Sequence, residues 1–167
     1  MPIQLLKPQN ATTRVIGLEA EAAEKVVEHL NALLADYHLH YQRLRNFHWN
    51  VSGPNFFTLH NQFEKLYNEA FETIDDIAER VLSLGYHPLS TMTEFLETSN
   101  LQEIREVLPA QEMVRALLDD YHKITDQKRK LIEVATEADD EGTADMITGF
   151  LESMEKNAWM LNAYLNQ

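Results

Sequence analysis

The sequence predicts an all-α protein built as a bundle of four long helices. Three observations carry this prediction: four segments repeat apolar residues at a period near 3.6, turn-forming residues separate those segments, and only one connection is long. The chain of 167 residues suffices for one domain with a substantial core. We therefore expect an N-terminal tail over residues 1–17 and one bundle domain over residues 18–167.

The first predicted helix runs from about Leu18 to Phe47. The residues that follow contain Gly53 and Pro54, a pair typical of turns and loops, so the helix should end before them. The apolar stripe of this helix consists of Leu18, Ala22, Val26, Leu30, Leu33, Tyr37, Tyr41 and Leu44.

The second predicted helix extends from an N-cap at Thr58 to Leu84, and Gly85 is a typical C-terminal stop. Residues 86–108 then form a connection too long for a simple turn, within which residues 91–97 predict a short extra helix. The stripe of the second helix consists of Phe63, Leu66, Ala70, Ile74, Ile77 and Val81.

Pro109 suits the first turn of a third helix, which we expect to reach about Ala138. An acidic break over residues 137–142 follows, and Thr143 is the expected N-cap of a fourth helix that ends near Tyr164. The long connection allows the second and third helices to run parallel, as in ferritin-like four-helix bundles with one crossover. The inward residues of the fourth helix are Ile147, Leu151, Met154, Ala158 and Leu161.

The charge balance disfavours nucleic acid as a partner. The chain has 27 acidic and 14 basic residues, for a formal charge of −13, and a net anion repels the DNA backbone unless it carries a basic patch. Lys7 and Arg14 are the only basic residues among the first 18, and the densest basic cluster, residues 128–130, is short and lies in a predicted helix. We expect weak or no DNA binding, with metal cations as the more natural partners.

The sequence also bears on the compartment. No apolar run approaches the roughly 20 residues that span a bilayer, and the N-terminus shows no apolar stretch of the kind found in signal peptides. The chain has no Cys, which excludes disulfides, thiolate zinc sites and a Cys nucleophile. We therefore expect a cytoplasmic protein that does not associate with membranes.

Four side chains form the candidate metal-binding set: His48, His60, Asp75 and Glu79. Taken singly, each has a common structural role, because histidines often bond near helix ends and acid pairs often form a solvated face. Here, however, the neighbours are apolar or aromatic, and polar groups are costly to bury without partners. Asp75 and Glu79 also lie one helical turn apart, so their carboxylates face the same direction.

Distance decides how such a site can form. His60 and Asp75 are fifteen residues apart, which corresponds to about 22 Å along a straight helix. A metal ligand reaches only about 2 Å from the ion, so one chain cannot place both on one metal. Two antiparallel copies of the second helix, related by a two-fold axis, can do so. Imidazole and carboxylate ligands without thiolate suit iron, zinc or manganese.

Residues 46–60 read NFHWNVSGPNFFTLH, and residues 75–80 read DDIAER. The spaced set His-x11-His-x14-Asp-x3-Glu, embedded in HWNVxG and AER, resembles the signature of the Dps family of mini-ferritins, and the helical layout is similar over nearly the entire chain. The resemblance implies a hollow homododecamer that oxidises ferrous iron, preferably with hydrogen peroxide, stores ferric mineral and protects the cell from oxidative damage. In such a ferroxidase, His48 and His60 of one subunit and Asp75 and Glu79 of its two-fold mate are the iron ligands.

The resemblance implies further roles for Trp49 and Asp145. Similar proteins place a Trp beside a ligand, where it can trap stray oxidising equivalents, although Trp is also frequent as an interface anchor. The acidic run Asp139–Glu141, together with Asp145, lies where such proteins build a negatively charged three-fold pore for iron uptake. Acids are also common at the N-terminus of any helix, and Asp145 is the strongest single candidate for the pore.

Three other functions compete with this interpretation. Larger ferritins and rubrerythrin-type di-iron enzymes carry Glu-x-x-His motifs, which this chain lacks; the nearest sequence is the single Asp119-Asp-Tyr-His122. A non-enzymatic helical interaction module would use the motif histidines for structure alone, and a nucleoid-compacting protein conflicts with the charge balance. His38 and His40 could form an extra surface metal site, but core or solvent roles are favoured.

Overall fold

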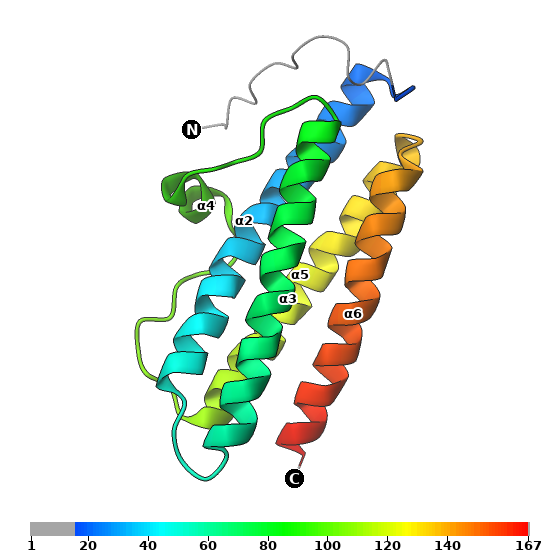
Figure 1. Cartoon of the computed structure of the whole chain (residues 1–167). Helices are drawn as coiled ribbons and strands as arrows, with labels where there is room; N and C mark the ends of the chain where they lie inside the picture. Colours follow the sequence, from blue (N-terminus) through cyan, green and yellow to red (C-terminus); the bar gives the residue numbers. More distant parts are fainter. Residues whose placement is uncertain (1–15, 167) are drawn as a thin grey trace.

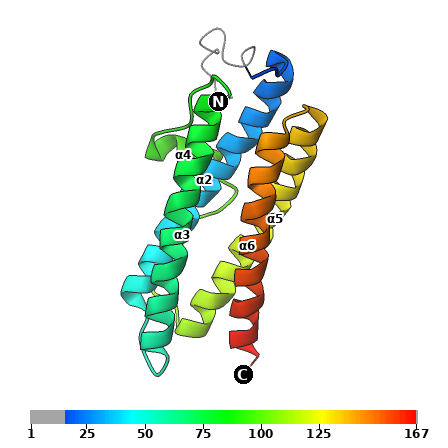
Figure 2. The same ribbon diagram turned by 45° about the vertical axis from the view of Figure 1, so that its right-hand side comes forward.

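A computed structural model describes residues 16–166, which contain five helices. Helices α2 (Ala20–Asn50), α3 (Phe56–Ser83), α5 (Ala110–Glu137) and α6 (Glu141–Leu165) form an elongated bundle, as Figure 1 shows. The short helix α4 (Met92–Thr98) lies beside α2, on the side of the bundle remote from α6 (Figures 1 and 2). The tail expected over residues 1–17 falls almost entirely outside the described residues, as do Lys7 and Arg14.

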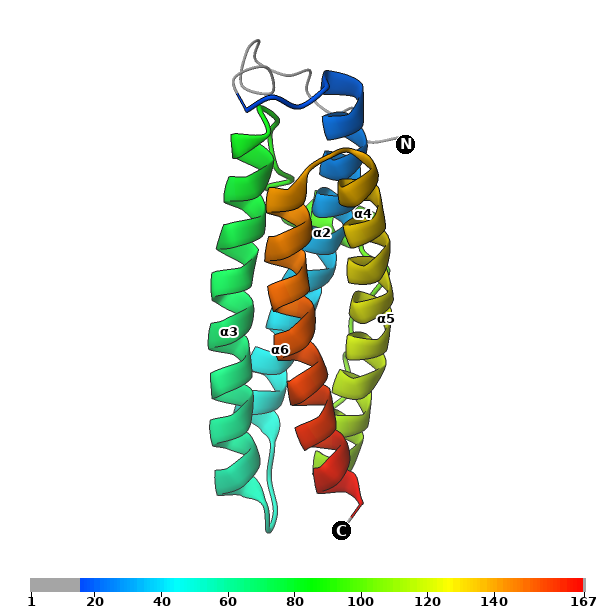
Figure 3. The ribbon, with the colours of Figure 1, turned by 90° about the vertical axis from the view of Figure 1, so that its right-hand side faces the viewer.

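The order of helix directions confirms the predicted bundle with one crossover. Helices α2 and α3 are antiparallel neighbours joined by a short loop, and α5 and α6 are joined in the same way (Figures 1 and 3). The crossover that contains α4 spans the length of the bundle, so α3 and α5 run in the same direction. No helix among residues 16–166 is both long and apolar enough to cross a bilayer.

Buried polar side chains hold this long crossover against the bundle. The carboxylate of Asp36, which is fully buried on α2, accepts hydrogen bonds from the Ser99 hydroxyl (2.6 Å) and the Asn100 amide (2.6 Å). Helix α4 begins with a reciprocal capping box between Thr91 and Glu94, which fixes where the short helix starts. The crossover is therefore ordered by specific bonds despite its length.

Gly85 ends α3 as the sequence predicts. Its φ of +88° is a conformation that only Gly adopts readily, and the amides of Gly85 and Tyr86 donate to the carbonyls of Leu82 (2.9 Å) and Val81 (3.2 Å). These two bonds form a Schellman motif, which satisfies carbonyls that would otherwise lack partners.

The two predicted N-caps are wrong. Helix α3 begins at Phe56 rather than after Thr58, because the turn at Gly53 leads directly into the helix and the Phe56 amide donates to the Gly53 carbonyl (3.0 Å). Helix α6 is capped by Asp140, not Thr143. The left-handed φ of +55° at Asp139 reverses the chain after α5, so that Asp140 lies at the cap and its carboxylate accepts from the Thr143 amide (3.0 Å) and hydroxyl (2.6 Å).

Candidate metal centre

The structure brings His48 and His60 together at one end of the bundle. His48 lies in the last turn of α2 and His60 lies near the start of α3, so the short loop between the helices places them side by side. Their imidazole rings stack with centroids 3.7 Å apart and planes inclined by 21°. Both side chains are half-buried.

Reciprocal hydrogen bonds determine which nitrogen of each ring is available. His48 Nδ1 lies 2.8 Å from the carbonyl oxygen of His60, and His60 Nδ1 lies 2.8 Å from the carbonyl oxygen of His48. Because a carbonyl can only accept, each Nδ1 must carry the proton and donate it. In the neutral ring the lone pair then resides on Nε2, so both histidines offer Nε2 to a cation.

Aromatic side chains fix the orientation of the two rings. Phe56 stacks on His60 with centroids 4.9 Å apart, and Tyr67 meets His48 edge-on at 5.4 Å and 82°. The backbone bonds and these contacts together leave the imidazoles little freedom, and such preorganisation lowers the entropy lost when a ligand binds.

Asp75 and Glu79 lie on the same helix as His60 but far along it. Helix α3 is continuous from Phe56 to Ser83, so the separation of about 22 Å estimated for His60 and Asp75 holds within one chain. Both carboxylates are exposed, and neither forms a hydrogen bond or ion pair with another residue in the range 16–166. Across that range no three His, Asp or Glu side chains gather as a metal site.

Arg80, the motif residue next to Glu79, has a structural role that the motif alone does not predict. Arg80 Nη2 lies 2.5 Å from Asp140 Oδ1, and Arg80 Nε donates to the Thr143 hydroxyl at 2.8 Å. Asp140 is 2% exposed, so this ion pair holds a buried carboxylate at the start of α6. Adjacent residues of the AER motif thus serve different purposes: Glu79 faces solvent, and Arg80 fixes the turn between α5 and α6.

The remaining predicted site residues lie on the surface. Trp49 is 58% exposed, with the Arg45 guanidinium 4.8 Å from its ring centroid. Asp139, Glu141 and Asp145 are exposed around the start of α6. Of the acidic run, only Asp140 is committed to capping and to the bond with Arg80, which leaves the other acids free to meet solvent.

His38 and His40 do not form a surface metal site. His40 is buried, and its Nδ1 donates to Asp120 Oδ2 (3.0 Å), while Asp120 Oδ1 pairs with Arg43. His38 stacks on Phe95 of α4 with centroids 3.8 Å apart. His40 thus has a core role, whereas His38 is half-buried and packs against α4, so the two rings have separate partners.

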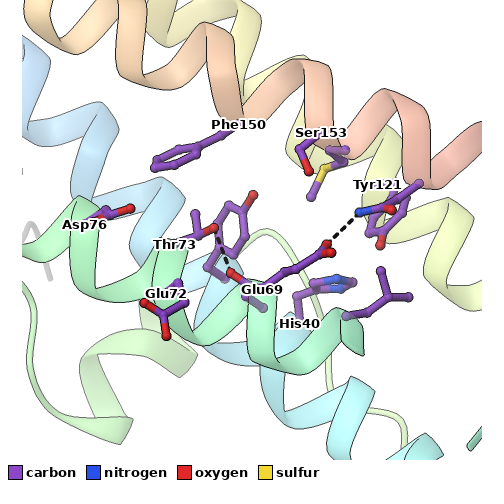
Figure 4. Close-up of a pocket in the computed structure, with 13 residues that line it drawn as sticks. His40, Glu69, Glu72, Thr73, Asp76, Tyr121, Phe150 and Ser153 are labelled. Carbon is purple, nitrogen blue, oxygen red and sulfur yellow. Dashed lines mark hydrogen bonds between the residues drawn. The ribbon is translucent and has the colours of Figure 1, made fainter. Parts of the chain in front are cut away.

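A cavity of about 270 Å³, which no pattern in the sequence predicts, opens between α3 and α6. Figure 4 shows Glu69 of α3 extending into this space, where its carboxylate accepts a hydrogen bond from Asn157 of α6 (2.9 Å). Lys128, which the sequence placed in a basic cluster, is fully buried close by and donates to the Phe150 carbonyl (2.7 Å). Burial lowers the pKa of Lys128 to about 7.

Comparisons with known proteins extend over the bundle. A family model described as a ferritin-like domain matches residues 27–167. The DNA protection during starvation protein 2 of Bacillus anthracis is 46% identical over 144 residues, covering 86% of this chain and 99% of that protein. A DNA protection during starvation protein of Brevibacillus brevis is 46% identical over 136 residues, covering 81% and 91% respectively.

Solved structures give the same result. Dps from Staphylococcus aureus superposes with a TM-score of 0.83 at 43% identity, covering 85% of this chain and 95% of that one. A Dps protein from Vibrio cholerae O1, described as a member of a broad superfamily of ferritin-like diiron-carboxylate proteins, superposes with a TM-score of 0.90 at 34% identity. That match covers 94% of this chain and 99% of the other, so the similarity includes every helix of the bundle.

Proposed function

The chain belongs to the Dps family of ferritin-like proteins, and from that premise we propose that it is a ferroxidase whose iron centres are shared between two subunits. Iron storage and protection against oxidative damage are the functions of this family. The observation that carries the finer proposal is a separation within one chain. The stacked histidines, each with Nδ1 bonded to a carbonyl, lie where α2 ends and α3 begins, and two exposed carboxylates without partners among residues 16–166 lie towards the end of α3.

A two-fold axis between antiparallel α3 helices would bring the histidines of one subunit to the carboxylates of the other. His48 and His60 would then supply neutral nitrogen ligands, and Asp75 and Glu79 of the second subunit would supply the negative charge that attracts ferrous iron. Neutral nitrogen and carboxylate oxygen without thiolate are donors suited to this substrate, and each interface would carry two such centres.

The proposed oxidant is hydrogen peroxide. Two ferrous ions supply the two electrons that convert one peroxide molecule, with two protons, into two water molecules. No hydroxyl radical is released when both electrons arrive together, which accounts for the protective role. The ferric product would be stored in the cavity of a homododecamer, and the exposed acids around Asp145 would line a pore through which ferrous iron arrives.

Two further parts of the proposal rest on surface residues and composition. Trp49 lies beside His48 and would accept stray oxidising equivalents, while its large exposure also suits a contact with a second subunit. The absence of Cys fits a cytoplasmic location, and the domain is proposed to span residues 18–167 after a tail.

The decisive experiment combines gel filtration with anaerobic addition of ferrous iron and then peroxide. The parent protein should elute as a dodecamer and oxidise iron rapidly, whereas a His48→Ala, His60→Ala variant should assemble and lose fast oxidation. His122→Ala is the matched control, because His122 is exposed on α5 outside the motif. Oxidation at the parent rate by the double variant would favour a non-enzymatic interaction module.

DNA binding is proposed to be weak or absent, even though similar proteins bear names that refer to DNA protection. The net charge of −13 opposes contact with phosphates. A gel-shift experiment at physiological salt should show no complex. Tight binding that weakens steeply with added salt would refute this part of the proposal and favour a nucleoid-compacting role.

A further inference from the structure

Tyr67 on α3 links the candidate iron centre to a series of aromatic side chains. Its ring contacts His48 edge-on at 5.4 Å, and the ring of Tyr41 lies 6.2 Å from it. The Arg45 guanidinium lies 5.3 Å from the Tyr41 ring and 4.8 Å from the exposed Trp49 ring. Two tyrosine rings in contact therefore lead away from the candidate ligand, and the Arg45 guanidinium lies between the second of them and the exposed Trp49.

The Tyr67 hydroxyl has a proton acceptor in place. It donates a hydrogen bond to Glu64 Oε1 at 3.3 Å, one helical turn earlier on the exposed side of α3. An ordinary phenol has a pKa of about 10 and therefore carries its proton near neutral pH. A protonated phenol gives up an electron far more easily when its proton leaves at the same time, and the carboxylate can receive that proton.

Other tyrosines among the described residues lack this combination. Tyr86 donates to the backbone carbonyl of Ala20 (3.1 Å), which cannot act as a base, and it lies beyond the far end of α3. Tyr164 accepts a hydrogen bond from Asn55 (2.7 Å). Tyr67 is thus the described tyrosine that both contacts a motif histidine and bonds to a carboxylate.

We propose that Tyr67, with Glu64 as its proton acceptor, donates one electron to the reaction at the iron centre when the centre holds a single ferrous ion. This inference rests on the proposed ferroxidase function. Hydrogen peroxide needs two electrons and two protons to form two water molecules, and one ferrous ion supplies only one electron. Without a second donor, the O–O bond breaks to give hydroxide and a hydroxyl radical.

Tyr67 completes the balance. The ferrous ion gives one electron and becomes ferric, and the phenol gives the second electron and becomes a neutral phenoxyl radical. The phenol proton passes to Glu64 and from there to solvent, and the solution supplies the two protons that peroxide consumes. Tyr41, the next ring in contact, can return an electron and a proton to Tyr67 and move the oxidising equivalent towards Trp49.

The test uses the assembled protein loaded anaerobically with less than one ferrous ion per centre, mixed with peroxide and freeze-quenched for electron paramagnetic resonance. The parent should give a tyrosyl radical, identified by the change in its line shape when the protein contains ring-deuterated tyrosine. The Tyr67→Phe variant should lose most of this signal, and spin trapping should detect more hydroxyl radical. Tyr86→Phe is the matched control and should keep the parent signal.

Glu64→Gln provides a second variant on the exposed face, where folding is not at risk. It keeps a hydrogen-bond acceptor but removes the base, so radical formation should slow and its solvent isotope effect should change. A tyrosyl signal of parent intensity in Tyr67→Phe overturns the inference. So does a parent that oxidises pairs of ferrous ions with peroxide but forms no tyrosyl radical with single ions, and the ferroxidase function then stands. A parent that does not oxidise iron with peroxide refutes both.

Discussion

The two groups of side chains proposed to bind iron lie at opposite ends of α3, and they differ in burial and in hydrogen bonding. At the start of the helix, His48 and His60 are stacked, half-buried and bonded to each other's carbonyls. Towards its end, Asp75 and Glu79 are exposed and without partners among the described residues. Neutral imidazoles can be preorganised at small cost, whereas two buried carboxylates without a cation would be strongly destabilising. The charged half thus stays in water in the single chain, and in the proposed centre it would be covered only when a second subunit and an ion are present.

Mixed assemblies test most directly whether each centre takes its histidines from one subunit and its carboxylates from another. Asp75→Asn and His60→Ala chains should each be inactive alone, because every centre in either assembly lacks one half. When the two chains are refolded together at equal amounts, half of the dimers pair unlike chains, and one of the two centres in each such dimer is complete. Roughly a quarter of the parent rate of peroxide-dependent iron oxidation should return.

The control for mixing is a pair of variants that damage the same half. His60→Ala co-assembled with His48→Ala should recover nothing, because no arrangement supplies both histidines from one chain. Mass spectrometry of the assemblies verifies that the chains have mixed. Verified mixed assemblies of the first pair without any recovery would contradict shared centres.

Near the carboxylate end of α3, the Arg80–Asp140 ion pair holds the turn before α6. Among the proposed substitutions, the one that removes this ion pair should lower the free energy of unfolding the most. Arg80→Ala leaves Asp140 buried without its cation, and breaking a buried pair in this way lowers the free energy of unfolding by about 3–5 kcal/mol. The loss should appear in urea titrations at fixed protein concentration. The stacked histidines should be unaffected, since Arg80 lies at the other end of α3.

Arg129→Ala is the matched control for this ion pair. Arg129 pairs with Glu155 at 2.5 Å on the surface, with both side chains about half exposed, and such pairs contribute at most about 1 kcal/mol. Equal destabilisation by Arg80→Ala and Arg129→Ala would show that the turn before α6 does not rely on the buried bond.

Local sequence signals predicted most of the fold, and they failed where two signals competed. The four long helices, the single crossover and the stop at Gly85 followed from periodicity, from the length of one connection and from the conformational freedom of Gly. The caps were misassigned at Thr58 and Thr143 because several capping residues stand close together in each turn. Backbone conformation at Gly53 and Asp139 decides between the candidates, and a propensity scale does not contain that information.

The site was predictable to the extent that helix geometry alone determines it. Fifteen residues of helix keep His60 and Asp75 apart in any single chain, and the structure confirms that α3 is unbroken between them. The tautomers of the histidines, the bond from Tyr67 to Glu64 and the ion pair of Arg80 depend on contacts between side chains. Those contacts require coordinates, because spacing in the sequence gives a direction but not a partner.

Substitution of Lys128 should change the free energy of unfolding without affecting the side chains at either end of α3. Its ammonium group is buried in the bundle and donates to the Phe150 carbonyl. A charge without a counter-ion is costly to bury, and an apolar side chain of similar volume removes that cost. Lys128→Met should therefore have a higher free energy of unfolding than the parent when both are measured between pH 6 and about pH 7. Iron oxidation should be unchanged.

The stability difference between Lys128→Met and the parent should depend on pH, and the pKa of Lys128 predicts the direction of that dependence. The folded-state pKa of Lys128 is about 7 and its usual value is 10.5, so between these values the unfolded chain binds more protons. The parent then gains stability as the pH rises, and the advantage of Lys128→Met should shrink towards pH 10. Lys130→Met, at an exposed position two residues later, should show no such trend. An advantage that is constant with pH would mean that Lys128 is charged in the folded protein.

The smallest predicted effect tests whether the histidine end is preorganised by its aromatic neighbours. Phe56→Leu keeps most of the apolar volume but removes the ring that stacks on His60. An aromatic pair contributes about 0.5–1.5 kcal/mol beyond burial, so anaerobic titration with ferrous iron should show roughly two- to tenfold weaker binding. The oxidation rate at saturating iron should change little, because both Nε2 atoms remain available. A variant that binds iron like the parent would show that the reciprocal carbonyl bonds alone hold the rings, and the histidine end would then owe its order to the backbone of the loop between α2 and α3.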